Sequence, residues 1–154
     1  MFSDIQDDKI VTIWGCRKGR KTNMKTLEEI KEFFSKDHYA TESGAVIEEV
    51  GDCYAKCSIE LSEMHRNAVG GVMGAVYYTL ADFAFAAATN HDQPNVVSLD
   101  ANITFLSGCK GTKLIAEAKC VRDGRTTCYY QIPITDENGN LLTMVNITGY
   151  KIQK

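Results

Sequence analysis

The sequence lacks an excess of positive charge. Among its 154 residues, 17 are Lys or Arg and 20 are Asp or Glu, which gives a net charge of −3. A main role in nucleic-acid binding is therefore disfavoured, because phosphate binding requires a basic face. A small anionic ligand held by a few local charges is still compatible with this balance. The 44% hydrophobic and 24% charged content is typical of one folded domain rather than of a disordered chain.

An apolar leader is also absent from the sequence. The first ten residues include three aspartates and no hydrophobic run, which is not the pattern of a secretory signal peptide. Six cysteines would suggest a disulfide framework in a short secreted chain. Without a leader, we expect the thiols to be reduced and the compartment to be cytoplasmic.

No uncharged hydrophobic run is long enough to cross a bilayer. The segment 71–89 has about the right length, but Asp82 lies near its centre. A carboxylate at that depth costs roughly 2.5–3.5 kcal/mol even on a lenient insertion scale. We therefore expect a helix buried in the core of a soluble domain, and no membrane partner.

Several chemical motifs are missing as well. The sequence contains neither a G-x-S-x-G nucleophile elbow nor a P-loop. Cys53 and Cys57 would lie roughly 13 Å apart on a strand, at about 3.3 Å per residue, which is too far for one metal ion. The three histidines, His38, His65 and His91, show no ligand spacing. We expect no metal site, and we expect the cysteines to pack in the core.

The chain does contain a clear succession of periodic segments. Residues 1–23 run from acidic to basic and are interpreted as an N-terminal extension of a domain at 24–154. Residues 26–36 carry apolar side chains at helical spacing behind a capping threonine, and they predict a short amphipathic helix. Apolar residues dominate 73–89 and predict a long buried helix, which the polar segment 90–94 ends.

Alternating patterns predict the strands of an antiparallel sheet. Apolar and polar residues alternate between 52 and 61, and Val46-Ile47 supplies a hairpin partner. Four further strands are predicted at 96–106, 113–122, 126–135 and 141–150. Pro133 indicates an edge position or a bulge. A helix that is apolar nearly all round must be wrapped, so we predict an α+β domain in which a curved antiparallel sheet encloses one long central helix.

The residues that point to chemistry lie between Asn67 and Asp82. Asp82 is an acid on an otherwise apolar helix, which is costly unless the carboxylate is used or paired. Gly74 lies where this helix begins, and free N–H groups there can stabilise a carbonyl oxygen that becomes negative. Structural interpretations stand beside these: a carboxylate bonded to a neighbouring element, and a flexible glycine-rich entry loop.

The spacing of two of these residues constrains any shared site. Gly74 and Asp82 are eight residues apart, which is roughly 12 Å along a helix at about 1.5 Å per residue. One reacting carbon cannot touch both within one chain. If both act on the same substrate, they come from different subunits with antiparallel helices, so the sequence predicts a two-fold dimer.

The same segment resembles the signature of the PaaI-like hot-dog thioesterases. That signature is Asn-x-x-Gly-x-x-His-Gly-Gly followed by Leu-Ala-Asp, and residues 67–75 and 80–82 follow it except at Met73, in place of the histidine, and at Ala75, in place of the last glycine. The segment 97–106 is similar to the family's Ser-x-Asp-x-x-Ile-x-Phe-Leu strand, and 122–125 is similar to its hairpin turn. The resemblance covers residues 26–152.

This resemblance implies a fold, a reaction and a set of site residues. The fold is the hot-dog form of the α+β class, assembled into homodimers and further into tetramers. The reaction is hydrolysis of an acyl-CoA thioester, with no metal or other cofactor. By position, Asp82 is implied as general base or nucleophile, and the Gly74 N–H of the other subunit as donor to the thioester carbonyl. Asn67 is implied to orient water or the carbonyl, and Ser98 to lie beside Asp82.

Further positions are candidates for contact with the substrate. These are Gly71 and Met73 at the helix start, and Tyr78 on the helix. The aromatic residues of the helix could line an acyl pocket or belong to the core. Arg122 and Arg125 could meet the CoA phosphates, or they could form a solvated hairpin.

Met73 stands where the family has histidine, so an apolar side chain replaces a polar ring at the mouth of the site. The backbone donor at Gly74 is kept. Two functions are therefore open. The first is an acyl-CoA thioesterase. The alternative is a non-catalytic acyl-CoA-binding module that has lost activity with the change to Met73. Hydratase chemistry in the same groove is a weaker third option, because the helix carries no histidine to shuttle protons.

Overall fold

The computed structural model describes residues 25–91 and 95–153, so the expected N-terminal extension, residues 1–23, lies outside the described part. The described helices are α1 (Leu27–Phe34), α2 (His38–Glu42) and α3 (Gly74–Asn90), and a 3-10 turn covers Glu63–His65. The strands are β1 (Ala45–Gly51), β2 (Tyr54–Glu60), β3 (Val96–Phe105), β4 (Lys113–Asp123), β5 (Thr127–Asp136) and β6 (Leu141–Lys151).

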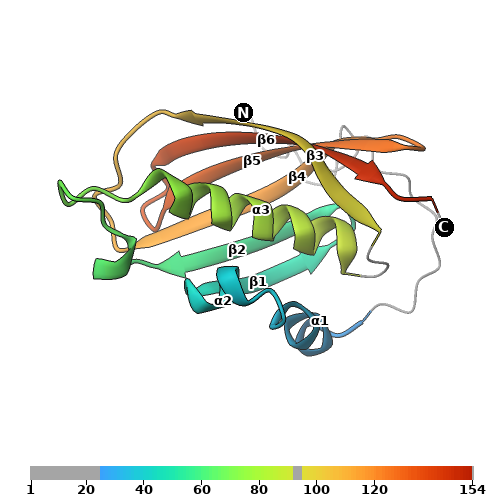
Figure 1. Cartoon of the computed structure of the whole chain (residues 1–154), viewed down its shortest axis with the longest axis horizontal. Coiled ribbons are helices and arrows are strands. Elements are labelled where there is room, and N and C mark those ends of the chain that lie inside the picture. Colours follow the sequence, from blue (N-terminus) through green and yellow to red (C-terminus); the bar gives the residue numbers. More distant parts are fainter. Residues whose placement is uncertain (1–24, 92–94, 154) are drawn as a thin grey trace, which may run out of the picture.

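The six strands form one antiparallel sheet in the order β1-β2-β4-β5-β6-β3. Figure 1 shows α3 lying along one face of this curved sheet, with α1 and α2 beside β1. The chain enters α3 after β2 and leaves it into β3, at the opposite side of the sheet from β1. This arrangement confirms the predicted α+β hot-dog fold.

The core lies between α3 and the sheet. Leu80, Ala81 and Ala84 of α3 are fully buried. In β2 and β4 the predicted alternation gives buried residues at Ala55, Cys57, Ile59, Leu114, Ala116 and Ala118. In β5 and β6, Ile132, Ile134, Val145 and Ile147 are buried as well. The many alanines let the sheet approach the helix closely, and close packing of this kind is what makes the burial of apolar area effective. Within the two described ranges, no helix is long and apolar enough to cross a membrane.

Helix α1 begins at the predicted cap. The Thr26 hydroxyl accepts a hydrogen bond from the Glu29 N–H at 3.2 Å, and the Glu29 carboxylate accepts one from the Thr26 N–H at 2.7 Å. This capping box satisfies N–H groups that the helix leaves open. Ile30 and Phe34 are buried, and the Phe34 ring packs edge-on against Phe83 of α3, with ring centroids 5.9 Å apart. This contact anchors α1 on α3 and places the following residues, which enter α2, over the same helix.

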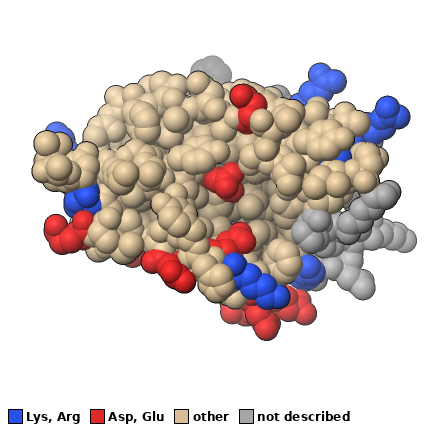
Figure 2. All heavy atoms as spheres, in the orientation of Figure 1, with Lys and Arg blue, Asp and Glu red and all other residues tan. Residues whose placement is uncertain are grey.

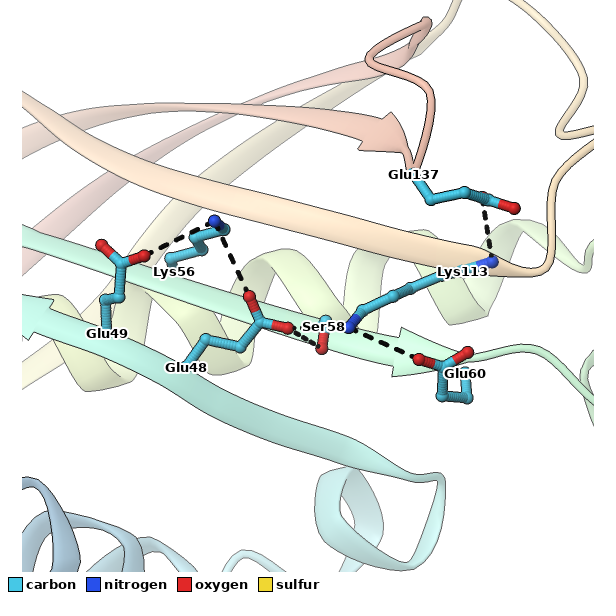
Figure 3. A network of polar contacts seen from close by, with 7 residues as sticks. All are labelled: Glu48, Glu49, Lys56, Ser58, Glu60, Lys113 and Glu137. Carbon is cyan, nitrogen blue, oxygen red and sulfur yellow. Dashed lines mark hydrogen bonds and ion pairs between the residues drawn. The ribbon is translucent and has the colours of Figure 1, made fainter.

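The face of the sheet that points away from α3 carries an ion-pair network (Figure 3). Glu48 lies between two lysines: its Oε1 is 2.9 Å from Lys113 Nζ, and its Oε2 is 3.7 Å from Lys56 Nζ. The Ser58 hydroxyl donates a hydrogen bond to Glu48 at 2.7 Å, and Glu60 lies 3.4 Å from Lys113 Nζ. The network therefore links β1, β2 and β4 on the outer face.

β3 differs from the half-buried strand that its alternation predicts. It lies at the edge of the sheet beside β6, and most of its side chains are exposed. A register shift between Ser98 and Asp100 inserts Leu99 as a bulge and reverses the alternation. Ser98, which the simple pattern places on the polar face, and Phe105 therefore both contact α3.

Of the two alternatives predicted for Pro133, an edge strand or a bulge, the edge strand is wrong, because β5 lies between β4 and β6. Pro133 pairs with Met144 of β6. On the side of β4, Ile134 and Gln131 are paired with β4 residues, but Pro133 between them is not. The sheet thus accommodates the missing proline N–H by interrupting one of its two ladders. A further register shift follows at once, between Ile134 and Thr135.

The cysteines only partly match the expectation of reduced core residues. Cys57, Cys109, Cys120 and Cys128 are free thiols. Cys57 is fully buried, and burial raises its pKa to about 12, so it packs as a small apolar side chain. Cys53 is disulfide-bonded, so the expectation of a reduced thiol is wrong at this position.

Candidate active site

Asp82 is half-buried in the middle of α3, and its nearest polar partner comes from β3. The Ser98 hydroxyl donates a hydrogen bond to Asp82 Oδ1 at 2.9 Å. This contact depends on the Leu99 bulge, which turns Ser98 toward the helix. The two residues that the family signature places side by side are therefore brought together. Within the described part of the chain, the partner of this carboxylate oxygen is thus a neutral donor and not a cation.

The start of α3 offers backbone N–H groups. Gly74 is the first helical residue, and Met73 occupies the N-cap without a side-chain hydrogen bond. The first N–H groups of a helix have no acceptor within the helix and carry partial positive charge. A Cβ on Gly74 would lie 3.0 Å from Cζ of the Phe105 ring. Two requirements therefore each explain a glycine at position 74: the close packing against β3 and the access of a substrate to the backbone.

Asn67 organises the loop that leads into α3. Its Oδ1 accepts hydrogen bonds from the N–H groups of Val69 and Gly71, at 3.1 and 3.0 Å. Its own N–H donates to the Gly71 carbonyl at 2.8 Å, and Gly70 turns the chain with a positive φ of 83°. Oδ1 is thus committed to the loop, so the Nδ2 amide is the part of this side chain that a substrate or water could meet. A Cβ on Gly71 would lie 3.4 Å from that Nδ2.

His65 supports the same loop, a role that the sequence pattern did not predict. It is buried, its Nδ1 accepts a hydrogen bond from the Ser62 N–H at 2.9 Å, and its Nε2 lies 2.9 Å from the Ser43 carbonyl oxygen. This pattern assigns the proton to Nε2. The His65 carbonyl accepts the Met73 N–H at 2.9 Å, so the residue fixes the start of α3. The only sequence signal is the spacing Ser62-x-x-His65, which resembles a capping box.

A pocket of about 520 Å³ opens beside Asp82, between α3 and the start of α2. Its lining residues are Asp37, His38, Tyr39, Ala40, Tyr78, Thr79, Asp82, Phe83 and Ala86. Of the aromatic candidates, Tyr78 reaches the pocket and is 38% exposed, whereas Tyr77 and Phe85 are buried in the core. Burial, and secondly the charge of Asp82, raise the pKa of Tyr78, so its hydroxyl stays protonated as a donor.

The other predicted site residues lie elsewhere in the protomer. Gly74 is the first residue of α3 and Asp82 the ninth, so they are roughly 12 Å apart at about 1.5 Å per residue. Met73 is 52% exposed at the helix start. Arg122 and Arg125 are exposed at the β4–β5 hairpin. None of these residues lines the pocket beside Asp82. Across residues 25–91 and 95–153, no three His, Cys, Asp or Glu side chains gather as metal ligands.

Comparison with known proteins gives the same class as the motif. Residues 69–143 match the Thioesterase superfamily. An Archaeoglobus fulgidus protein named for an expected esterase activity is 30% identical over 146 residues, which are 94% of this chain and 94% of that protein. Human acyl-coenzyme A thioesterase 13 is 31% identical over 85 residues, which are 53% of this chain and 60% of the human protein.

The fold agrees with these sequence matches. A variant of the phenylacetic acid degradation protein PaaI from Thermus thermophilus superimposes with a TM-score of 0.71 at 25% identity, covering 75% of this chain and 100% of that one. The chain therefore belongs to the thioesterase superfamily and has the hot-dog fold, and its relatives indicate a thioester hydrolase. The resemblance to PaaI-like thioesterases is confirmed.

Proposed function

We propose that this protein hydrolyses acyl-CoA thioesters, with Asp82 as general base or nucleophile. The observation that carries the proposal is the Ser98–Asp82 hydrogen bond beside a pocket of about 520 Å³. A pocket of this size suits the acyl part of a small-molecule substrate. The likeness to human acyl-coenzyme A thioesterase 13 supports CoA thioesters as the substrate class.

In the general-base route, Asp82 accepts a proton from a water molecule as the water oxygen attacks the thioester carbon. The carbonyl oxygen becomes negative, and the carbon–sulfur bond then breaks to release the CoA thiolate and the carboxylic acid. In the nucleophilic route, the Asp82 carboxylate attacks the thioester carbon, and the carbon–sulfur bond breaks to release the CoA thiolate and leave a mixed anhydride on Asp82. Water then hydrolyses this anhydride, which releases the carboxylic acid and regenerates the Asp82 carboxylate. In both routes the Ser98 hydroxyl holds one carboxylate oxygen and leaves the other to act.

We further propose that the oxyanion donor is the N–H of Gly74 of the partner subunit in a homodimer. The helix spacing keeps Gly74 and Asp82 of one chain apart, and β3 presents an edge with exposed apolar side chains. Val97 and Leu99 on this edge are 47% and 63% exposed. Such an edge favours pairing with a second copy, and a two-fold axis there sets the two α3 helices antiparallel. Leu99→Glu should then yield a monomer without activity, which light scattering and rate measurements check together.

The CoA moiety is proposed to contact the outside of this site. Arg122 and Arg125 are the proposed partners of its phosphates, and Gly71 and Met73 at the helix start are proposed to line its path. Loss of the family histidine at Met73 removes a side-chain contribution but keeps the backbone donor of Gly74. Catalysis is therefore expected to persist.

The alternative is a module that binds acyl-CoA without turnover. Two observations favour it: Met73 lacks a polar group, and Asn67 Oδ1 is already occupied by the N–H groups of Val69 and Gly71. In this case the protein is stabilised thermally by CoA esters without consuming them.

The deciding experiment measures initial rates with short, medium, long and aromatic acyl-CoAs for the wild type, Asp82→Ala and Asp82→Asn. Loss of thioester absorbance is followed, because the protein's own thiols react with thiol reagents. We expect turnover in the wild type and a loss of about 1,000-fold in both variants, the size typical for a general base. Stabilisation by esters without turnover supports the binding module. Turnover that survives in Asp82→Asn contradicts the proposed role of the carboxylate.

A further inference from the structure

The pocket beside Asp82 contains a second carboxylate that the fold does not use. Asp37 is the N-cap of α2, yet its side chain makes no capping hydrogen bond. Its backbone makes the turn instead: the N–H donates to the Phe34 carbonyl at 3.0 Å, and the carbonyl accepts from the N–H and the hydroxyl of Thr41, at 3.0 and 3.1 Å. The backbone of Asp37 is therefore fixed on both sides, while its carboxylate at the pocket wall is available to a ligand.

Among residues 25–91 and 95–153, the pocket lining contains no lysine or arginine to compensate the two carboxylates. One histidine, His38, also lines the pocket, and its Nδ1 lies 3.7 Å from Glu42 Oε1. The rest of the wall is the hydroxyl groups of tyrosine and threonine, with apolar side chains. Figure 2 shows acidic atoms in the hollowed middle of this face and most Lys and Arg atoms toward its rim.

The charge of Asp82 also acts on Asp37. Burial, and secondly the charge of Asp82, raise the pKa of Asp37, whereas the neighbouring His38 acts in the opposite direction. A third negative charge that entered this space would be repelled by both groups, because a partly enclosed pocket screens charges less than open water does. A hydroxyl group would instead meet carboxylate oxygens, which are strong acceptors.

We propose that Asp37 determines the class of acyl group that enters the pocket. Acyl chains whose far end is uncharged or carries a hydrogen-bond donor are accepted, and acyl chains that end in a carboxylate are rejected. The inference rests on the proposed function, since it takes the Asp82 pocket as the acyl site. It adds to that function a substrate class, the thioesters of monocarboxylic acids, and a residue that discriminates them from those of dicarboxylic acids.

The test uses thioesters that differ only at the far end of the acyl group. Hexanoyl-CoA, 6-hydroxyhexanoyl-CoA and adipoyl-CoA share one chain length, and butyryl-CoA with succinyl-CoA forms a shorter pair. Values of kcat/KM are measured for the wild type, Asp37→Asn and Asp37→Lys. The matched control is Asp52→Asn, which makes the same chemical change at an exposed position between β1 and β2.

We expect the wild type to prefer hexanoyl-CoA over adipoyl-CoA by at least about 10-fold, the size of one modest charge interaction. It should use 6-hydroxyhexanoyl-CoA at least as well as hexanoyl-CoA. Asp37→Asn should reduce the preference over adipoyl-CoA by about 10-fold, and Asp37→Lys should reverse it. Asp52→Asn should leave it unchanged. Thermal unfolding verifies that each variant folds.

The inference and the proposed function fail in different ways. If the wild type hydrolyses hexanoyl-CoA but the adipoyl-to-hexanoyl ratio is the same in all variants, the role of Asp37 is overturned and the thioesterase stands. If no ester is hydrolysed, the thioesterase falls, and calorimetric dissociation constants for the same esters test Asp37. Equal affinities for hexanoyl- and adipoyl-CoA in the wild type, or no binding of either, then overturn the inference too.

Discussion

The two faces of the sheet hold their carboxylates in opposite ways. On the outer face, Glu48 lies between Lys113 and Lys56 and accepts a hydrogen bond from Ser58 (Figure 3). On the α3 side, Asp82 accepts a hydrogen bond from a neutral hydroxyl and lines a pocket whose described residues include no lysine or arginine. The paired carboxylate links strands, whereas the carboxylate with the neutral partner is the one proposed to act on a substrate. Both residues are acids, and they differ in their partners.

The largest effect is expected from the loop that supports the α3 face. His65→Ala removes a buried ring and both of its contacts, to the Ser62 N–H and the Ser43 carbonyl, and should lower the free energy of unfolding by about 3 kcal/mol. His65→Asn keeps an acceptor for Ser62, and His65→Gln keeps a donor for Ser43, so each should lose less. Urea unfolding measures the three changes. If His65→Ala and the wild type have the same urea midpoint of unfolding, His65 does not stabilise the α3 side of the molecule.

A smaller effect is expected where β3 packs against the helix start. The added methyl of Gly74→Ala meets the Phe105 ring, and overpacking of this kind costs about 1–2 kcal/mol. Activity should fall as well, because the N–H groups at the start of α3 shift. Phe105→Leu in the same chain should restore stability, so a double-mutant cycle measures the coupling. If the stability effects of the two substitutions are additive in that cycle, the close approach of Phe105 is not the reason for glycine at position 74.

The neutral hydrogen bond to Asp82 can be removed by itself. Ser98→Ala should lower kcat about 10-fold, since a hydrogen bond to a charged group contributes about 1.5 kcal/mol. KM should change little, because the pocket lining does not include Ser98. Ser98→Thr keeps the hydroxyl and is the matched control. A wild-type kcat in Ser98→Ala would mean that Asp82 needs no partner from β3.

The smallest effect belongs to the outer face, and it depends on pH. The hydrogen bond from Lys113 holds the pKa of Glu48 below its usual range, against the opposing effect of burial. Such a carboxylate stabilises the fold above its unfolded pKa and loses this contribution as the pH falls through its folded value. Glu48→Gln should therefore cost about 1 kcal/mol at neutral pH and progressively less below about pH 4.5.

Glu60→Gln is the control for this substitution, because Glu60 is exposed and touches the same Lys113. It should change stability by a few tenths of a kcal/mol at most, as exposed pairs do. Thermal unfolding at several pH values and salt concentrations reports both variants, and the Glu48 effect should shrink in salt. Activity should stay at the wild-type level in both. A loss of activity in Glu48→Gln would show that the two faces are not independent.

Much of the fold could be predicted because its signals are local. The apolar run predicts a helix at 73–89, and α3 is Gly74–Asn90. The alternation at 113–122 predicts the buried residues of β4 correctly. Asp82 could be singled out because an acid within an apolar helix is visible in the sequence. Its catalytic role, like those of Asn67 and Gly74, stays a prediction.

Helix and strand periodicity and capping act over a few residues, so the elements, the wrapped helix and the acid upon it follow from local patterns. Which groups meet depends on how distant segments pack. Ser98 faces Asp82 because a bulge reverses the alternation of β3, and Pro133 lies in a central strand because one ladder is interrupted. Asp37, 45 residues before Asp82, reaches the same pocket because Phe34 packs on Phe83. Such contacts depend on register and packing between distant segments, which no local pattern encodes.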